Sequence, residues 1–270
     1  MMEENILEVK NLETSFFTHV GEVKAVRGVS FSVKKGEILG IVGESGSGKS
    51  VSLMSMMQLI EHPGKIKNGE VFFEGNDLLK KKEKEMLNVR GKEIAMIFQD
   101  VGAALDPIRK IRSQYEEAIA VHEKQPKHRY IEKAVDMLKK MHLTDPGRVL
   151  DSYPFELSGG MKQRVGIAMG MTAKPKLLLA DEPTSALDVT IQAQVVHQMK
   201  ELRDKYGVTI ILVTHNMGVA SYLSDKIGVM CRSRMVEFGT RDEIIYHPKE
   251  SYTKELLEAV PKLGGERFAK

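Results

Sequence analysis

Residues 43–50 have the types and spacing that bind a nucleotide phosphate. They read Gly-Glu-Ser-Gly-Ser-Gly-Lys-Ser, which satisfies the pattern G-x-x-x-x-G-K-[ST] at every fixed position. The apolar run 37–42 precedes them and residues 51–57 continue at helical spacing, so a strand, a glycine loop and a helix are predicted. Loop N–H groups and the positive end of the helix dipole would face the phosphates. Lys49 would reach the β- and γ-phosphates of ATP, and the Ser50 hydroxyl would bind Mg²⁺. The predicted nucleotide contacts of this segment are Gly43, Glu44, Ser45, Gly46, Ser47, Gly48, Lys49, Ser50 and Val51.

Two carboxylates follow another apolar run, residues 177–180. A continuous apolar run of this kind is typical of a central strand, and open α/β sheets bind ligands at the carboxyl edge of their strands. Asp181 would therefore lie beside the glycine loop and contribute to the Mg²⁺ shell. Glu182 would orient and polarise the water that attacks the γ-phosphate.

A second segment, Ser158-Gly159-Gly160, begins a predicted helix over 161–171. Serine followed by glycines could serve simply as a helix N-cap. The same arrangement also offers a hydroxyl and approachable backbone N–H groups to an anion. Because one chain needs only one γ-phosphate cradle, a second cradle is expected to serve the ATP held by another copy.

Composition excludes several other classes of protein. The 270 residues are 42% hydrophobic with a net charge of +3, which is too small to indicate nucleic acid binding. One cysteine, Cys231, rules out internal disulfides and multi-cysteine metal sites, and its apolar surroundings predict a buried thiol. No secretory signal and no apolar run of membrane-spanning length is visible. We expect a cytosolic protein that reaches any membrane by docking.

The pattern of elements predicts an α/β fold with a P-loop NTPase (RecA-like) core. Alternating residues at 6–9 and 28–33, with a short strand at 69–75, indicate an N-terminal antiparallel β layer. Helical spacing at 113–121 and 128–141, without strand-like runs, indicates an inserted helical subdomain. We expect a single domain whose core spans 1–99 and 175–245, with the helical subdomain at about 100–174 and a short tail at 246–270.

The order and spacing of these motifs resemble the nucleotide-binding subunit of ABC transporters over essentially the whole chain. The resemblance implies two ATP molecules clamped between two head-to-tail subunits. It implies that Gln99 senses Mg²⁺ and couples to the transmembrane partner, that Asp188 aligns the subunits, and that His215 contacts the γ-phosphate. Phe16 corresponds to the aromatic that stacks on adenine, although the adjacent Phe17 or a core role is nearly as good an interpretation. The opposing subunit would be contacted through Ser158, Gly159, Gly160 and Gln163.

Flanking phrases at 150–154, 186–194 and 247–257 resemble the peptide/nickel branch of ABC importers. That branch pairs two ATPase chains, here a second copy or a related ATPase, with integral membrane permeases and an extracytoplasmic binding protein. It implies a place on the cytoplasmic face of the membrane. Di- or oligopeptides stand slightly ahead of nickel or a metal chelate as cargo, although the cysteine cluster of longer peptide-importing members is missing. A soluble ABC-type regulatory ATPase without a membrane partner is an alternative function of a different class. Three places depart from the usual pattern: Asn216, the turn 231–234 and the stretch 100–107.

Overall fold

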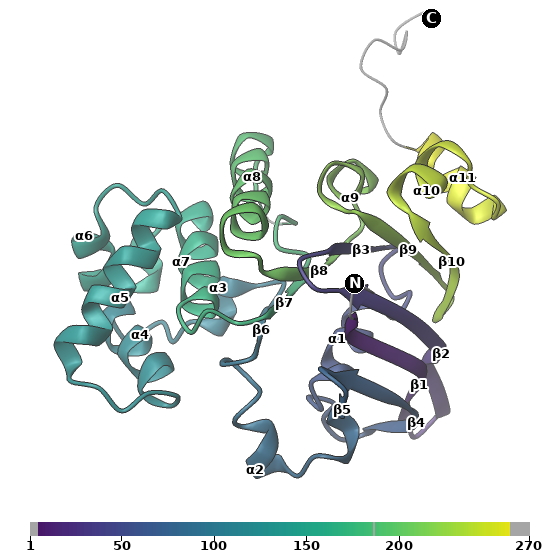
Figure 1. Cartoon of the computed structure of the whole chain (residues 1–270), viewed down its shortest axis with the longest axis horizontal. Coiled ribbons are helices and arrows are strands. Elements are labelled where there is room, and N and C mark those ends of the chain that lie inside the picture. Colours follow the sequence, from purple (N-terminus) through teal and green to yellow (C-terminus); the bar gives the residue numbers. More distant parts are fainter. Residues whose placement is uncertain (1–4, 186, 260–270) are drawn as a thin grey trace, which may run out of the picture.

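The computed structural model of the chain describes residues 5–185 and 187–259. Ala186 and the predicted tail beyond residue 259 lie outside the described residues. Two β-sheets and a lobe of helices make up the fold (Figure 1). No helix in the described ranges combines the length and hydrophobicity needed to cross a membrane.

A six-stranded sheet forms the centre, with the strand order β10-β9-β3-β8-β7-β6. Every neighbouring pair is parallel except β10 with β9, which is antiparallel. Strands β3, β7 and β8 are buried along their whole length, as their continuous apolar sequences predict. The strands are β3 (Ile38–Val42), β6 (Ile94–Ile97), β7 (Leu177–Asp181), β8 (Thr209–Thr214), β9 (Lys226–Cys231) and β10 (Arg234–Thr240).

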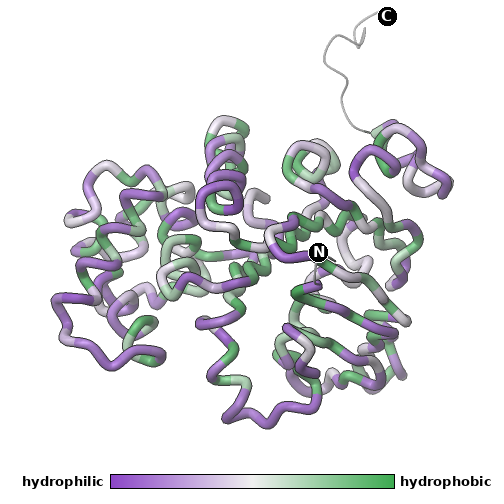
Figure 2. Tube along the Cα trace, viewed as in Figure 1, coloured by the Kyte–Doolittle hydropathy of each residue, from purple (hydrophilic) through white to green (hydrophobic). Residues whose placement is uncertain are grey.

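The side chains of β6, β7 and β8 alternate between two hydrophobic clusters, one on each face of the sheet, and residues of β3 and β9 contribute to a third. Leu177, Leu179 and Ile211 pack toward the second sheet. Leu178 and Ile210 instead pack against helices. Hydrophobic residues accordingly concentrate along the central strands (Figure 2). The central sheet is thus fixed from both sides, and its carboxyl edge is a rigid support for loops.

The second sheet is antiparallel, with the order β2-β1-β4-β5. Its first strands are much longer than the predicted segments 6–9 and 28–33. Register shifts between Val9 and Leu12 and between Thr14 and Ser15 interrupt the pairing of β1, and such bulges break the alternation by which a strand is recognised in sequence. The strands are β1 (Asn5–Thr18), β2 (Gly21–Lys34), β4 (Gly64–Phe73) and β5 (Asn76–Asp77).

Helices α3 to α7 lie between β6 and β7 in the chain, and α4 to α7 form a lobe at one end of the molecule (Figure 1). This is where the sequence predicts a helical insert, but the division at residues 99/100 and 174/175 stays a prediction. The helices are α1 (Lys49–Met56), α2 (Glu83–Met86), α3 (Val101–Ala104), α4 (Ile111–Ala120), α5 (Lys127–Lys140), α6 (Pro146–Asp151), α7 (Gly159–Met171), α8 (Val189–Tyr206), α9 (Met217–Leu223), α10 (Arg241–Tyr246) and α11 (Ser251–Glu258). Two 3-10 turns occupy Leu78–Lys80 and Pro154–Glu156.

The prediction of a buried thiol at Cys231 is wrong. Cys231 is only partly buried, because it is the last residue of β9 and lines a cavity beside the glycine loop. The apolar run before it, Ile227 to Met230, is buried as expected.

Candidate nucleotide-binding site

The loop 43–48 connects β3 to α1 in a backbone conformation that requires glycine. Gly43, Gly46 and Gly48 have φ values of 150°, 80° and 99°, which residues with a Cβ rarely adopt. A Cβ on Gly48 would lie 2.2 Å from the carbonyl oxygen of Ala25, and one on Gly43 would lie 2.1 Å from that of Met230. The glycine spacing is therefore set by two close approaches of neighbouring backbone as well as by the shape of the loop.

Lys49 is the first residue of α1, and its ammonium lies inside the loop. Its Nζ donates hydrogen bonds to the carbonyl oxygens of Gly43 at 2.7 Å and Glu44 at 2.8 Å. Burial lowers the pKa of Lys49, while the negative charges of Glu182, Asp181 and Glu44 act in the opposite direction. The cation is thus held at the centre of the loop, where a phosphate would sit.

Ser50 and Asp181 meet across the gap between α1 and β7. The Ser50 hydroxyl donates to Asp181 Oδ1 at 2.8 Å. Burial raises the pKa of Asp181, and the hydrogen bond from Ser50 works against that rise. A hydroxyl beside a carboxylate suits Mg²⁺, which takes oxygen ligands from one or two side chains and completes its shell with phosphate and water. Within the described ranges no group of three or more His, Cys, Asp or Glu could hold a metal alone. The residues present therefore suit a metal that arrives with a nucleotide.

Side chains that follow three neighbouring strands, β6, β7 and β8, meet at the Glu182 carboxylate. Gln99 follows β6 and its Nε2 donates to Glu182 Oε2 at 3.4 Å. His215 follows β8 and its Nδ1 lies 3.1 Å from the same oxygen. The other oxygen, Oε1, accepts no hydrogen bond from any residue in the part of the chain that the structure describes. That oxygen is free to accept a proton from a bound water.

The backbone of Glu182 is held in an unusual conformation. Its φ of 43° is uncommon for a residue with a side chain. Its N–H donates to the carbonyl oxygen of Val213 at 2.9 Å, and the Ser185 hydroxyl donates to its carbonyl oxygen at 3.1 Å. Backbone strain that neighbouring bonds maintain is concentrated at functional sites. The side chain is 10% exposed and that of His215 is 54% exposed, so the pair opens to solvent on the histidine side.

The second glycine segment lies at the start of α7. Ser158 is the N-cap, and its Oγ accepts the N–H of Met161 at 3.3 Å. Ser158 and Gly159 are exposed. A Cβ on Gly160 would lie 2.6 Å from Ile191 Cγ2, so α7 and α8 meet at this glycine. Among residues 5–185 and 187–259, no hydrogen bond or ion pair joins the segment to the loop 43–50.

Of two further residues that the resemblance assigned to the ATP site, Asp188 has a side-chain hydrogen bond within the described chain and Gln163 has none. Asp188 is the N-cap of α8, and its Oδ1 accepts the N–H of Ile191 at 3.0 Å. Gln163 is buried in α7, and its Nε2 has no hydrogen-bond partner among the described residues. Neither side chain is brought to the phosphate loop of its own chain by a hydrogen bond.

The aromatic pair on β1 presents its rings to opposite faces of the strand. Phe16 is half-buried, and a Cβ on Gly64 would lie 2.7 Å from its ring. Phe17 is 44% exposed, and the Lys67 ammonium lies 5.3 Å from its ring centroid. The assignment of Phe16 to adenine stays a prediction.

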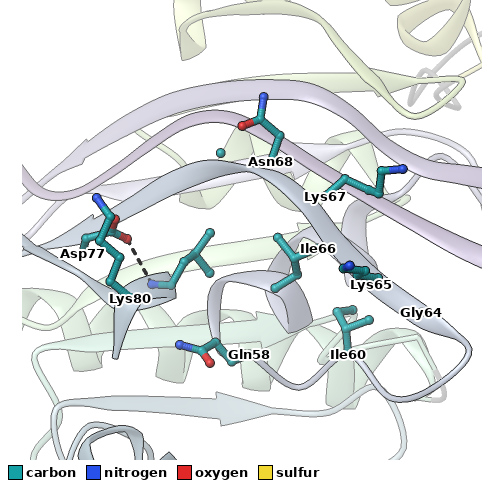
Figure 3. Close-up of a pocket in the computed structure, with 11 residues that line it drawn as sticks. Gln58, Ile60, Gly64, Lys65, Ile66, Lys67, Asn68, Asp77 and Lys80 are labelled. Atoms are coloured by element: carbon teal, nitrogen blue, oxygen red, sulfur yellow. Dashed lines mark hydrogen bonds and ion pairs between the residues drawn. The ribbon is translucent and has the colours of Figure 1, made fainter. Parts of the chain in front are cut away.

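A pocket of about 600 Å³ lies on the antiparallel sheet, away from the strand ends that carry Glu182 and His215. Lys65, Lys67 and Lys80 are among its lining residues (Figure 3). Lys80 pairs with Asp77 at 3.0 Å and Lys67 with Glu22 at 3.8 Å, so two of the three lysines form ion pairs with carboxylates of the chain. The pocket brings none of the predicted nucleotide contacts together.

Two of the three departures from the usual pattern, Asn216 and the turn 231–234, have structural explanations. Asn216 is the N-cap of α9, and its Oδ1 accepts the N–H groups of Gly218 and Val219, as aspartate would. Arg232 and Ser233 form the two-residue turn between β9 and β10, both with positive φ. The Ser233 N–H donates to the carbonyl oxygen of Ser47 at 3.2 Å, so the turn supports the glycine loop.

Sequence reasoning missed one contact to the glycine loop. The Tyr252 hydroxyl, on α11, accepts the N–H of Glu44 at 3.1 Å. In the sequence, residues 247–257 indicated only a resemblance to the peptide/nickel branch of importers. Nothing in this segment indicates that α11 contacts the glycine loop. The two residues are far apart in sequence, so only tertiary structure shows the contact.

Known proteins share this arrangement. The sequence profile described as ABC transporter matches residues 26–185. The oligopeptide transport ATP-binding protein OppD of Bacillus subtilis (strain 168) is 51% identical over 96% of this chain and 72% of its own. The dipeptide transport ATP-binding protein DppD of Escherichia coli (strain K12) is 44% identical over 97% of this chain and 80% of its own.

Solved structures give the same result for the fold. The dimeric post-hydrolysis ATP-binding cassette MJ0796, bound to ADP and Pi, superposes with a TM-score of 0.78 at 27% identity, over 87% of this chain and 98% of its own. CbiO1 from Clostridium perfringens, part of the ABC transporter complex cbiONQ, has a TM-score of 0.76 at 26% identity, over 91% and 92% of the two chains. The fold is therefore that of the ABC cassette, as the motifs predict, and the chain belongs to the ABC transporter family as one of its ATP-binding ATPases.

Proposed function

We propose that this chain hydrolyses MgATP to power an importer of di- or oligopeptides, as a peripheral subunit on the cytoplasmic face of the membrane. The observation that carries the proposal is the cluster at the Glu182 carboxylate, 3.1 Å from His215 and 3.4 Å from Gln99. It lies at the same sheet edge as the Ser50–Asp181 pair. The similarity to OppD and DppD, whose names specify peptide transport, favours peptides over nickel or a metal chelate.

Binding would begin at the glycine loop. The N–H groups of residues 46–51 would cradle the phosphates, and Lys49 would add its charge from within the loop. Ser50 and Asp181 would hold Mg²⁺ together with Gln99, and the metal would neutralise charge on the phosphate oxygens. Phe16 would stack on the adenine ring. Because Asp181 is buried, bringing a cation beside it removes much of the cost of keeping its carboxylate charged.

Hydrolysis would use the free oxygen of Glu182. With Oε2 occupied by Gln99 and His215, Oε1 would accept a proton from the attacking water. The exposed edge of the His215 ring would contact the γ-phosphate and signal its loss. Lys49 would stabilise the charge that develops on the transferred group.

The second half of the site would come from another subunit, either a second copy or a related ATPase. Ser158 and Gly159 are exposed at the positive end of α7, a helix of 13 residues. Facing a neighbour's glycine loop, they would donate to its γ-phosphate, while Asp188 and Gln163 would align and support the interface. Integral membrane permeases would dock near residues 99–107, and an extracytoplasmic binding protein would deliver the cargo.

Replacement of Glu182 by glutamine tests the catalytic assignment. Glu182→Gln keeps the size and the contact to His215 but cannot take a proton, so we expect turnover to fall by about 100-fold or more while ATP stays bound. Turnover within twofold of the original protein would remove Glu182 from the role of base.

Co-purification tests whether the chain serves transport. A transporter subunit should copurify with integral membrane subunits, whereas a regulatory ATPase would copurify with none.

A further inference from the structure

The peptide group between Gly43 and Glu44 is held from both of its polar ends. Its carbonyl oxygen accepts the ammonium of Lys49 at 2.7 Å. Its N–H donates to the Tyr252 hydroxyl at 3.1 Å. In a trans peptide the C=O and N–H point in opposite directions. Lys49 and Tyr252 therefore bind opposite edges of one rigid peptide plane and restrain its orientation.

Apart from these two hydrogen bonds, the two ends of this peptide are restrained unequally. Gly43 is buried against the carbonyl of Met230, whereas the residues that follow it are exposed. Gly43 has a φ of 150°, and glycine permits the neighbouring dihedral angles to change at low cost. Glu44, Ser45 and Gly46 are exposed, so side-chain packing does not restrain the outer half of the loop. Rotation of the peptide would move the Gly43 carbonyl away from Lys49. The ammonium would then lose one of the two carbonyls that place it in the phosphate cradle.

Helix α11 gives the Tyr252 hydroxyl a firm support. Thr253 is completely buried, and Tyr252, Leu256 and Leu257 pack against the cluster that includes Val42 and Met217. The two residues that precede the helix are tied to β10, since the carboxylate of Glu237 accepts the N–H groups of Lys249 at 2.7 Å and Glu250 at 3.3 Å.

The same helix also lies near the loop that carries His215. Leu256 and Ala259 line a cavity of about 250 Å³ together with Gly43, His215 and Asn216. In Figure 1, α11 lies beside α10 at the β9–β10 end of the central sheet. Helix α11 is thus close both to the glycine loop and to the loop that carries His215.

We infer that Tyr252 is a positioning residue for nucleotide binding, which it serves by holding the Gly43–Glu44 peptide so that Lys49 stays in the phosphate cradle. The inference rests on the proposed role of residues 43–50. Tyr252 does not touch the nucleotide in this account, so it should affect affinity much more than the rate of the chemical step.

The test compares Tyr252→Phe with Tyr246→Phe in the full chain. Tyr246 belongs to α10 and is 70% exposed, so it controls for loss of a tyrosine hydroxyl in the same part of the chain. We expect Tyr252→Phe to raise the Kd for MgATPγS and the KM for ATP by about three- to tenfold, which is what one neutral hydrogen bond is worth. Its kcat should change less than twofold, and Tyr246→Phe should change neither constant.

Other outcomes overturn the inference without touching the proposed function. If Tyr252→Phe lowers the melting temperature but leaves the Kd unchanged, the hydroxyl has only a structural role. Hydrogen exchange of the Glu44 amide in the unmodified protein is a check that needs no variant: protection supports the contact, and exchange at the rate of a free amide contradicts it. Failure of the proposed function is distinct, because the unmodified protein would then bind no MgATPγS.

Discussion

The Ser50 hydroxyl and Asp181 Oδ1 are 2.8 Å apart, which joins the start of α1 to the end of β7. Both oxygens are of the kind that Mg²⁺ prefers. Asp181 is nevertheless 5% exposed, and burial raises its pKa. Burial of the charged carboxylate therefore costs folding stability, which the Ser50 hydrogen bond and the nearby Lys49 ammonium offset in part.

Asp181→Asn should make the protein more stable in the absence of nucleotide. The pKa of Asp181 is higher in the folded protein than in the unfolded chain. The free-energy cost of ionising the buried carboxyl therefore begins as the pH rises past the usual pKa of aspartate, and it reaches its full value above the pKa in the folded protein. We therefore expect a higher melting temperature than the original protein at neutral pH and little difference at pH 3, where the carboxyl is protonated in both states. Mg²⁺-dependent turnover should fall by about 100-fold. A variant less stable than the original at neutral pH would contradict the assignment.

Loss of His215 should affect the rate more than binding. The Glu182 carboxylate is the one hydrogen-bond partner of the ring among the described residues, so His215→Ala should lower kcat by about 100-fold and change the Kd for MgATP by less than about threefold. The neighbouring Asn216→Asp is the matched control, because aspartate also caps α9 and should retain turnover. Equal losses in both variants would mean that the loop, rather than the histidine, is needed.

The capping role and the proposed intersubunit role of Ser158 can be separated by two substitutions. Asparagine and aspartate both cap helices as well as serine does, so Ser158→Asn and Ser158→Asp should have melting temperatures close to that of the original protein. Aspartate would place a negative charge against the γ-phosphate of the opposing subunit. We expect ATP turnover to survive in Ser158→Asn and to be lost in Ser158→Asp. Similar turnover in both would show that no phosphate approaches this position.

The turn that supports the glycine loop should be stabilised by glycine. Ser233 has a φ of 68°, which costs a residue with a Cβ more than it costs glycine, and its two backbone hydrogen bonds would remain. Ser233→Gly should raise the free energy of unfolding by about 0.5–1 kcal/mol, or the melting temperature by about 2 °C. Ser32→Gly, in the extended strand β2, should lower it. A lower stability for Ser233→Gly would mean that the turn needs its side chain.

Local patterns were sufficient to predict the phosphate loop and the acidic strand end. The pattern of Gly43–Ser50 can be read from sequence alone, although the close approaches of the Met230 and Ala25 carbonyls to Gly43 and Gly48 appear only in the structure. Strands β3 and β7 were recognised because strands buried on both faces are apolar throughout. The sequence assigned Glu182 to the attacking water, and only the resemblance assigned His215 to the γ-phosphate. Their hydrogen bond is a finding of the structure, in which both residues directly follow neighbouring parallel strands.

The features that escaped prediction depend on contacts between distant segments. Strand β1 is bulged, so its alternation fails after Val9. Strand β6 is only four residues long, too short to stand out. Tyr252 reaches Glu44 only because β9, β10 and α11 bring the end of the chain back to the loop, and Cys231 is half-buried because that loop leaves a cavity beside it.

The central claim is that ATP binds between two subunits and that Glu182 is the base in its hydrolysis. The most direct measurement is the mass of Glu182→Gln by light scattering, with and without MgATP, together with the nucleotide retained. The account predicts a monomer without nucleotide and a dimer holding two ATP molecules with it. A monomer that retains one ATP under both conditions would contradict it.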